Sequence, residues 1–195
     1  MGCTMKTDTS MIAWAAKHAS SLLSPLGDRW LHTRGVVERA QEVGKAFDEE
    51  HCLLLIAAAY VHDIGYAPSL EVTGFHPLDG AYYLISHNQT RLASLVAYHS
   101  EAQCEAQLRG LATELNNIPR ELSALADALT YCDMITGPTG LHISFEERLE
   151  DIFKRYDENH MVNRAIHQAI PSLARAVKQT QNTLLHYEKH FQLVS

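Results

Sequence analysis

The chain has 195 residues, of which 46% are hydrophobic and 20% charged, and its formal net charge is -7 at pH 7. This length and composition predict one soluble, packed domain over residues 1–195 and exclude a disordered chain or a fibrous repeat. The negative charge argues against binding to nucleic acid polymers or to an anionic membrane surface, so we expect a small-molecule partner.

No segment of the sequence has the pattern of a membrane anchor or a secretion signal. The apolar run 52–61 is far shorter than the roughly 18 residues that span a bilayer. The N-terminal stretch MGCTMKTDTS lacks an apolar signal region, and Lys6 stands where a myristoylation signal requires Ser or Thr. We therefore predict a cytoplasmic protein. Because no CxxC pair is present, we expect no disulfide framework among the cysteines, which are Cys3, Cys52, Cys104 and Cys132.

The first third of the chain has the period of about 3.6 residues that is typical of helices. A first helix is predicted from Thr9 or Ser10 to Leu23, where Ser24-Pro25-Leu26-Gly27 stops it. A second helix is predicted over about 28–43. A third begins at Asp48 with an acidic first turn, which suits the positive end of the helix dipole, and we expect Gly65 to end it.

The rest of the chain continues the helical period, and no alternating strand pattern interrupts it. Pro77 and Pro119 are predicted to open helices at their first positions, and Ser144 begins the sequence of a capping box. We expect a break in the last helix at Pro171. The predicted helices cover about 77–87, 90–100, a short stretch to 115, 119–135, 144–156 and 161–195. The fold class is therefore all-α, with C-terminal helices over about 144–195 that pack on a core over about 28–137.

Three polar residues fall on the apolar stripes of these helices. His32 shares the inward stripe of the second helix, and His99 shares that of the helix near residue 95. Asp133 ends a stripe that begins with Leu122 and Leu125. Any one such residue is more often a hydrogen-bonded core residue than a ligand. Their occurrence on several helices together points instead to a shared site.

The doublet His62-Asp63 follows directly after the most apolar segment of the chain, CLLLIAAAYV. Burying an unpaired carboxylate costs roughly several kcal/mol, so two buried aspartates need a partner that neutralises their charge. A divalent cation does this, accepts neutral imidazoles as ligands and is favoured by the negative end of the third helix. His76, just before Pro77, is a further candidate ligand.

The order His32, His62-Asp63, Asp133 resembles the HD-domain superfamily of metal-dependent phosphohydrolases. The segments RWLHTRGVVERA, AAAYVHDIGYAP, FHPLDGAYYL, LVAYHS and ALTYCDMITG each resemble helices of that superfamily, and they cover about 28–137. The resemblance implies an all-α helical bundle with a metal site at its centre. It also implies that His32, His62, Asp63 and Asp133 bind one metal ion.

Further features place the chain within or outside branches of that superfamily. His76 and His99 match the extra histidines of dinuclear members, in which the Asp of the doublet bridges two ions. The cyclic-dinucleotide phosphodiesterase branch, HD-GYP, has paired histidines where this chain has Tyr98-His99, and the chain lacks a GYP motif. Tyr66 stands where many members carry Lys or Glu. We therefore expect a branch other than HD-GYP, with one or two divalent ions from among Mn, Fe, Zn, Mg, Co and Ni.

The favoured hypothesis is hydrolysis of a small phosphoester, a nucleotide first among the candidates, by attack of metal-activated water. Asp63 and His62 are the predicted catalytic residues. Arg34, Arg91 and Arg148 are candidates for binding the phosphorylated substrate, although each also fits a solvated helix surface. The other histidines are interpreted as surface residues.

Two other functions fit the same residues. The ligand order also resembles mixed-valent diiron oxygenases of the HD fold, because imidazole and carboxylate ligands serve iron as well as manganese or zinc. A non-catalytic module that binds a metal or a nucleotide is the third possibility. The segment from about residue 160 is expected to pack on the core or on another subunit, so a homo-oligomer stays open.

Overall fold

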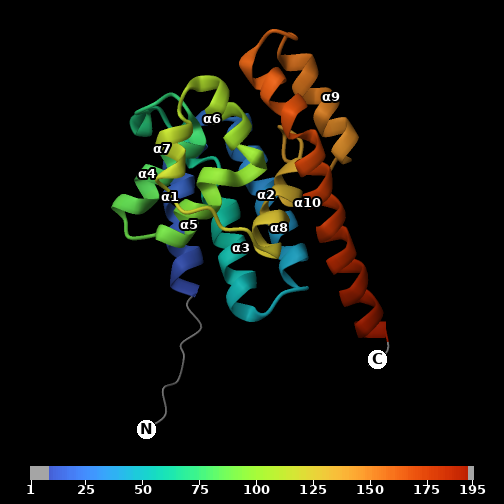
Figure 1. Cartoon of the computed structure of the whole chain (residues 1–195). Helices are drawn as coiled ribbons and strands as arrows, with labels where there is room; N and C mark the ends of the chain where they lie inside the picture. The colour runs from blue at the N-terminus through green and yellow to red at the C-terminus, as the bar shows by residue number, and fades with distance from the viewer. Residues whose placement is uncertain (1–8, 193–195) are drawn as a thin grey trace.

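The computed structural model describes residues 9–192, and within this range every regular element is helical (Figure 1). The only strand-like pairing in these residues is an isolated bridge between Thr136 and His142. The all-α prediction is therefore confirmed, whereas Cys3 and Lys6 lie outside the described residues. The helices are α1 Thr9–Leu23, α2 Asp28–Gly44, α3 Glu49–Val61, α4 His76–Ser86, α5 Thr90–Tyr98, α6 Gln103–Arg109, α7 Ala112–Asn116, α8 Ala124–Met134, α9 Phe145–Arg155 and α10 Met161–Gln192.

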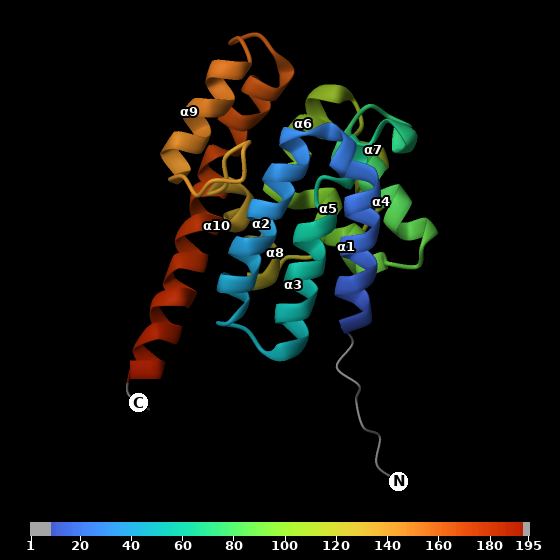
Figure 2. The same cartoon turned by 180° about the vertical axis from the view of Figure 1, so that it is seen from behind.

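The apolar helix α3 lies at the centre of the core. It packs against α1, α2, α5 and α8, and Figure 2 shows it between α1 and α2. Leu55 and the run Ala57–Ala59 are fully buried. A helix that is apolar on every side is stable only when it is surrounded, which explains its central position. Whatever follows the last turn of α3 is thereby delivered to the middle of the molecule.

The two ends of α3 are formed differently from each other. At the N-terminus the prediction is confirmed, because Asp48 is the N-cap and its carboxylate accepts a hydrogen bond from the His51 amide at 2.9 Å. At the C-terminus the prediction was wrong. The helix ends at Val61, and Gly65 lies in the following 3₁₀ turn Ile64–Tyr66. Gly65 also lacks the positive φ of a glycine cap.

The structure gives Gly65 a packing role instead. A Cβ atom at this position would lie 2.0 Å from the carbonyl oxygen of His76 and 2.6 Å from the amide nitrogen of Gly80. Only glycine lets the start of α4 approach the turn after α3 so closely. This contact holds His76 beside the doublet His62-Asp63, which follows the end of α3.

A second close backbone contact joins α2 to the turn after α8. A Cβ atom on Gly35 would lie 2.3 Å from the Gly140 carbonyl oxygen, and a Cβ atom on Gly140 would lie 2.5 Å from that of Leu31. The Gly140 amide donates to the Gly137 carbonyl at 3.0 Å, so the stretch 137–140 is a tight turn against α2.

The helix predicted from Pro119 begins later in the structure. Ser123 is the N-cap of α8, and its hydroxyl accepts from the Ala126 amide at 3.2 Å. The serine hydroxyl satisfies an amide at the helix end, whereas a proline side chain has no acceptor for such a bond. Leu122 therefore precedes the helix and is 79% exposed rather than part of the buried stripe. Leu125, Leu129 and Asp133 are buried as predicted.

The C-terminal helices contact the body of the molecule through α8 and α6. The capping box of α9 is confirmed, with Ser144 and Glu147 exchanging hydrogen bonds. The predicted break at Pro171 was wrong, because α10 is continuous through it. Buried Ala169 and Leu173 anchor α10 on both sides of the proline, so packing outweighs the one hydrogen bond that proline removes. The division into a core and C-terminal helices stays a prediction.

Within residues 9–192, no helix combines the length and the apolar character that crossing a membrane requires. Over the same residues Cys52, Cys104 and Cys132 are free thiols. The eight histidines that are not candidate ligands are exposed or half-buried, in agreement with their interpretation as surface residues; they are His18, His51, His87, His142, His160, His167, His186 and His190.

Substituting Gly65 with alanine should lower the free energy of unfolding by about 3 kcal/mol, because the new methyl group collides with the backbone of α4. Denaturant unfolding measures the change. Gly137→Ala is the matched control, since a Cβ atom there meets its nearest neighbours at 3.5 Å, an ordinary contact distance. Equal stability losses in the two variants would contradict the packing role of Gly65.

Candidate metal centre

Five segments of the chain bring four imidazoles and two carboxylates to one place. α2 contributes from its middle, α3 from the turn that follows it, α4 from its first residue, the 3₁₀ turn after α5 from its start and α8 from its last turn. All but His76 are buried, and the His76 side chain is 18% exposed. The six residues are His32, His62, Asp63, His76, His99 and Asp133. The structure thus brings together all six predicted ligands.

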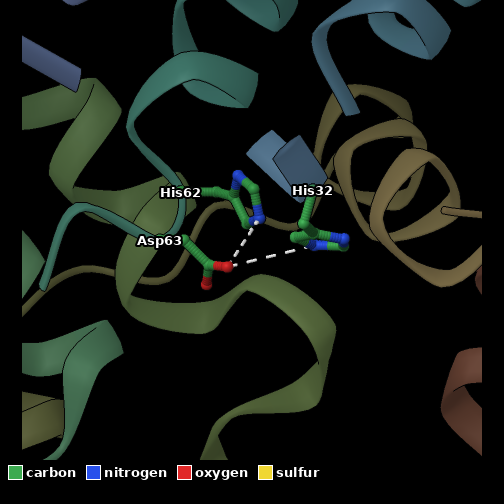
Figure 3. Close-up of side chains that lie close together, drawn as sticks. All are labelled: His32, His62 and Asp63. Carbon is green, nitrogen blue, oxygen red and sulfur yellow. Dashed lines mark ion pairs between the residues drawn. The ribbon is translucent and has the colours of Figure 1, made fainter. Parts of the chain in front are cut away.

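The carboxylate of Asp63 lies between two pairs of imidazoles. Its Oδ2 is 3.4 Å from Nε2 of His62 and 3.9 Å from Nε2 of His32 (Figure 3). Its Oδ1 is 3.3 Å from Nε2 of His76 and 3.7 Å from Nε2 of His99. Two groups of potential metal ligands result, each with two histidines, and they share Asp63.

Backbone carbonyls orient three of the imidazole rings. In each of these rings Nδ1 lies within hydrogen-bonding distance of a carbonyl oxygen and, as the donor, leaves the Nε2 lone pair directed toward Asp63. The Nδ1 to oxygen distances are 3.1 Å from His32 to Gly137, 2.8 Å from His62 to Ala59 and 2.6 Å from His99 to Val96. Nε2 of His62 is fully buried and has no hydrogen-bond partner among the described residues. A buried nitrogen in this state is suited to a cation.

Asp133 closes the cluster on the side of α8. Its Oδ1 is 3.0 Å from Nε2 of His32 and 3.5 Å from Nη2 of Arg148, and its Oδ2 accepts a hydrogen bond from the Ser100 hydroxyl. His32 therefore faces an oxygen acceptor at each of its two nitrogens. A neutral imidazole has one proton for these two acceptors, and a cation between Nε2 and the carboxylate would satisfy the second.

Arginine and histidine neighbours keep both carboxylates ionised. Burial raises the pKa of Asp63, but Arg29 and His62 outweigh it and hold that pKa well below its usual range. Burial likewise opposes ionisation of Asp133, while His32 and Arg148 lower its pKa well below the ordinary value. Burial lowers the pKa of His76 to about 4, so its imidazole is neutral near pH 7. Charged carboxylates and a neutral imidazole are the forms that bind metals.

Sequence reasoning missed Arg29 and the place of Tyr66 in this centre. Nη1 of Arg29 is 2.5 Å from Oδ2 of Asp63, and its guanidinium lies 3.9 Å from the Tyr66 ring centroid. Tyr66 in turn stacks on His76, with ring centroids 3.9 Å apart. Arg29 was detectable, because it precedes His32 by three residues and so shares a face of α2. The stacking of Tyr66 depends on the turn after α3, which periodicity does not describe.

A cavity of about 420 Å³ opens onto the centre. Of the three predicted phosphate-binding arginines, Arg148 lines it and is 7% exposed rather than solvated. Arg34 is exposed and does not line the cavity, and Arg91 pairs with Glu121 at 2.9 Å on the surface. Three arginines that the sequence analysis did not select also line it: Arg29, Arg109 and Arg155.

The fold and this cluster define the class: an all-helical protein with a buried histidine and aspartate centre that can hold divalent metal ions. The family model of the HD domain matches residues 29–132, which is more than half of the chain. The chain belongs to the HD domain family. A search of curated proteins and a search of solved structures find no match.

The low pKa of His76 predicts an acid-sensitive stability in protein stripped of metal. The unfolded chain protonates this residue near pH 6.5 and the folded chain only near pH 4, so acid favours unfolding between these values. The free energy of unfolding should fall by about 3 kcal/mol across the window. Denaturant unfolding in a chelator at a series of pH values measures it. His76→Asn should flatten this part of the profile, and an unchanged slope in the variant would refute the assignment.

Proposed function

We propose that the protein is a metal-dependent phosphohydrolase that acts on a small phosphoester, with nucleotides as the first candidates. The observation that carries the proposal is the shared carboxylate of Asp63, which offers each of its oxygens to a different pair of imidazoles. Membership of the HD domain family supports it, because that family suggests metal-dependent phosphohydrolase activity. Arginines in the adjoining cavity supply the charge that a phosphate requires.

In this proposal the six residues divide into two sites that share Asp63. His32, His62 and Asp63, with Asp133, hold one divalent ion, and Asp63, His76 and His99 hold the second. When bound, such ions lower the pKa of coordinated water and offset negative charge on phosphoryl oxygens. Mn, Fe, Zn, Mg, Co and Ni all suit imidazole and carboxylate ligands to differing degrees.

The chain itself binds and orients the substrate in this proposal. Arg148, whose Nη2 is 3.5 Å from Asp133, is placed to hold a phosphoryl oxygen next to the centre. The carbonyl bonds to the Nδ1 atoms fix the imidazoles, so little reorganisation is needed when ligands bind. The proposed location is the cytoplasm, where small phosphorylated metabolites are available.

The diiron oxygenase is the alternative that the same ligands allow, because imidazole and carboxylate ligands also bind iron. Protein purified without chelators and tested with nucleotide substrates separates the two functions. Phosphate release under argon supports the hydrolase. Oxygen uptake that depends on substrate, together with a mixed-valent iron EPR signal, supports the oxygenase.

Asp63→Asn should abolish both metal retention and phosphate release, since one substitution removes an anionic ligand from both proposed sites. Elemental analysis of the purified protein gives the metal content, and a phosphate assay across a nucleotide panel gives the activity. Asp48→Asn is the matched control, because Asp48 is an exposed helix cap outside the centre. A wild-type protein that binds no divalent metal would sink both enzymatic functions.

Arg148→Gln should lower kcat/KM for phosphate release by about 10- to 100-fold, the loss expected when a charged hydrogen bond to phosphate is removed. Arg148→Lys should recover part of the loss, since it restores the charge without the planar guanidinium. Steady-state kinetics measure both variants, with metal content checked beforehand. Full activity of the Gln variant would show that Arg148 does not contact the substrate.

A further inference from the structure

The helix α9 forms a wall of the cavity although it lies beyond the part of the chain that the HD domain model matches. The match ends at residue 132, whereas Arg148, Ile152, Arg155 and Tyr156 all line the cavity. A small apolar cluster that includes Met134, Ile152 and Leu173 packs α9 against α8 and α10. The matched segment thus supplies five of the six clustered residues, Asp133 lies one residue beyond it, and a segment further along the chain supplies this wall.

Two arginines of this wall share one carboxylate. Nη1 of Arg148 is 3.3 Å from Oδ2 of Asp151, and Nη2 of Arg155 is 2.8 Å from the same oxygen. Because both reach one atom, the two guanidinium groups lie close enough to contact two anionic groups of one small molecule. Asp151 itself is not among the described residues that line the cavity. Both arginines thus line the cavity, whereas the carboxylate that they share does not.

The arginines also have hydrogen-bonding capacity left over. Arg148 is nine-tenths buried, and its Nε has no partner among the described residues. Arg155 is exposed, and among residues 9–192 the only carboxylate that it contacts is that of Asp151. Asp151 and Asp133, which Arg148 also contacts at 3.5 Å, together leave several of the ten N–H donors of the two guanidinium groups without an acceptor. A ligand with acceptor oxygens would satisfy the donors that face the cavity.

Most acidic residues of the cavity have partners other than the arginines of α9. Glu105 pairs with Arg109 at 2.6 Å, and Asp79 accepts hydrogen bonds from Thr73 and from the Gly74 amide. Asp63 contacts Arg29 and the histidines, while Asp133 contacts both His32 and Arg148. Glu71 also lines the cavity, so the positive charge that matters here is that of the two α9 guanidinium groups and not a net charge of the whole cavity.

We propose that Arg155 binds a second anionic group of the substrate, next to the phosphoryl group that Arg148 holds. The preferred substrate class is then a small phosphoester that carries a further phosphate or carboxylate, rather than a simple monophosphate. This inference rests on the proposed function for the identity of the reacting group. The inference itself concerns only affinity, namely tighter binding of ligands with two anionic groups, and affinity is measured separately from turnover.

Phosphonates test the preference, because their carbon–phosphorus bond replaces the ester that the enzyme would hydrolyse. Methylphosphonate has one anionic group, phosphonoacetate adds a carboxylate, and methylenediphosphonate adds a second phosphoryl group. Each probe is titrated calorimetrically into the purified protein in the absence of oxygen. Phosphonoacetate or methylenediphosphonate should bind at least about tenfold more tightly than methylphosphonate, which is the effect of one charge-assisted hydrogen bond. Which of the two gains affinity identifies the second group.

Arg155→Gln should remove this gain and leave the affinity for methylphosphonate unchanged, while Arg155→Lys should retain part of it. Arg164→Gln is the matched control, because Arg164 is exposed near the same end of the molecule but does not line the cavity. Thermal unfolding checks the fold of each variant. Metal content after each titration excludes chelation by the probe as the source of affinity.

Three results would overturn the inference: no binding of any probe, equal binding of all three, or a gain that persists in Arg155→Gln. The proposed function fails by a different measurement. If Arg155→Gln loses the extra affinity but the protein releases no phosphate in the presence of metal, the second anion site is supported and the hydrolase function is refuted. If the protein releases phosphate but binds the three probes equally, the hydrolase function is supported and the second anion site is refuted.

Discussion

The rest of the structure depends on the burial of one carboxylate at the C-terminal end of a helix, which is the end that repels negative charge. Asp63 follows the last turn of α3, where unpaired backbone carbonyls already concentrate negative charge. An isolated buried carboxylate costs several kcal/mol, roughly, so this position is tolerated only with strong compensation. Arg29 supplies part of it, and four imidazoles surround the rest. The compensation arrives from separate helices, which ties the packing of the bundle to the chemistry of its centre.

That dependence explains why the core is built around α3. A helix buried on every side carries its terminal residues to the point where the other helices converge. α2, α4, α8 and the turn after α5 each contribute a polar residue to this place, and His32 and Asp133 come from stripes that are otherwise apolar. Hydrogen bonds to backbone carbonyls then fix the imidazole rings, so the site is organised by the helix ends themselves.

Periodicity was sufficient to predict most of the helices and three of the six clustered residues, while the doublet, His76 and the ligand set as a whole were indicated by the apolar run before the doublet and by the resemblance to the HD superfamily. His32, His99 and Asp133 interrupt apolar stripes, and an interrupted stripe is visible without a structure. The misses have other causes. Gly65 was interpreted as a helix cap although it serves a contact between segments distant in sequence, and Pro171 was interpreted as a break although packing carries α10 through it. Arg148 was named only as one of three candidate arginines and Arg155 was not named, because only the fold shows which face of α9 meets the cavity.

The contact between Gly35 and Gly140 makes an ordinary-looking turn unusually intolerant of change. Turns at the surface usually accept insertions and substitutions, since few contacts restrain them. Here the turn 137–140 rests on the backbone of α2, and its first carbonyl accepts the bond from His32. Lengthening this turn would shift a ring of the buried centre from more than a hundred residues away in the chain. In designing variants of this protein, the turn therefore belongs with the buried histidine and aspartate centre, and the loops elsewhere are the safer places for new sequence.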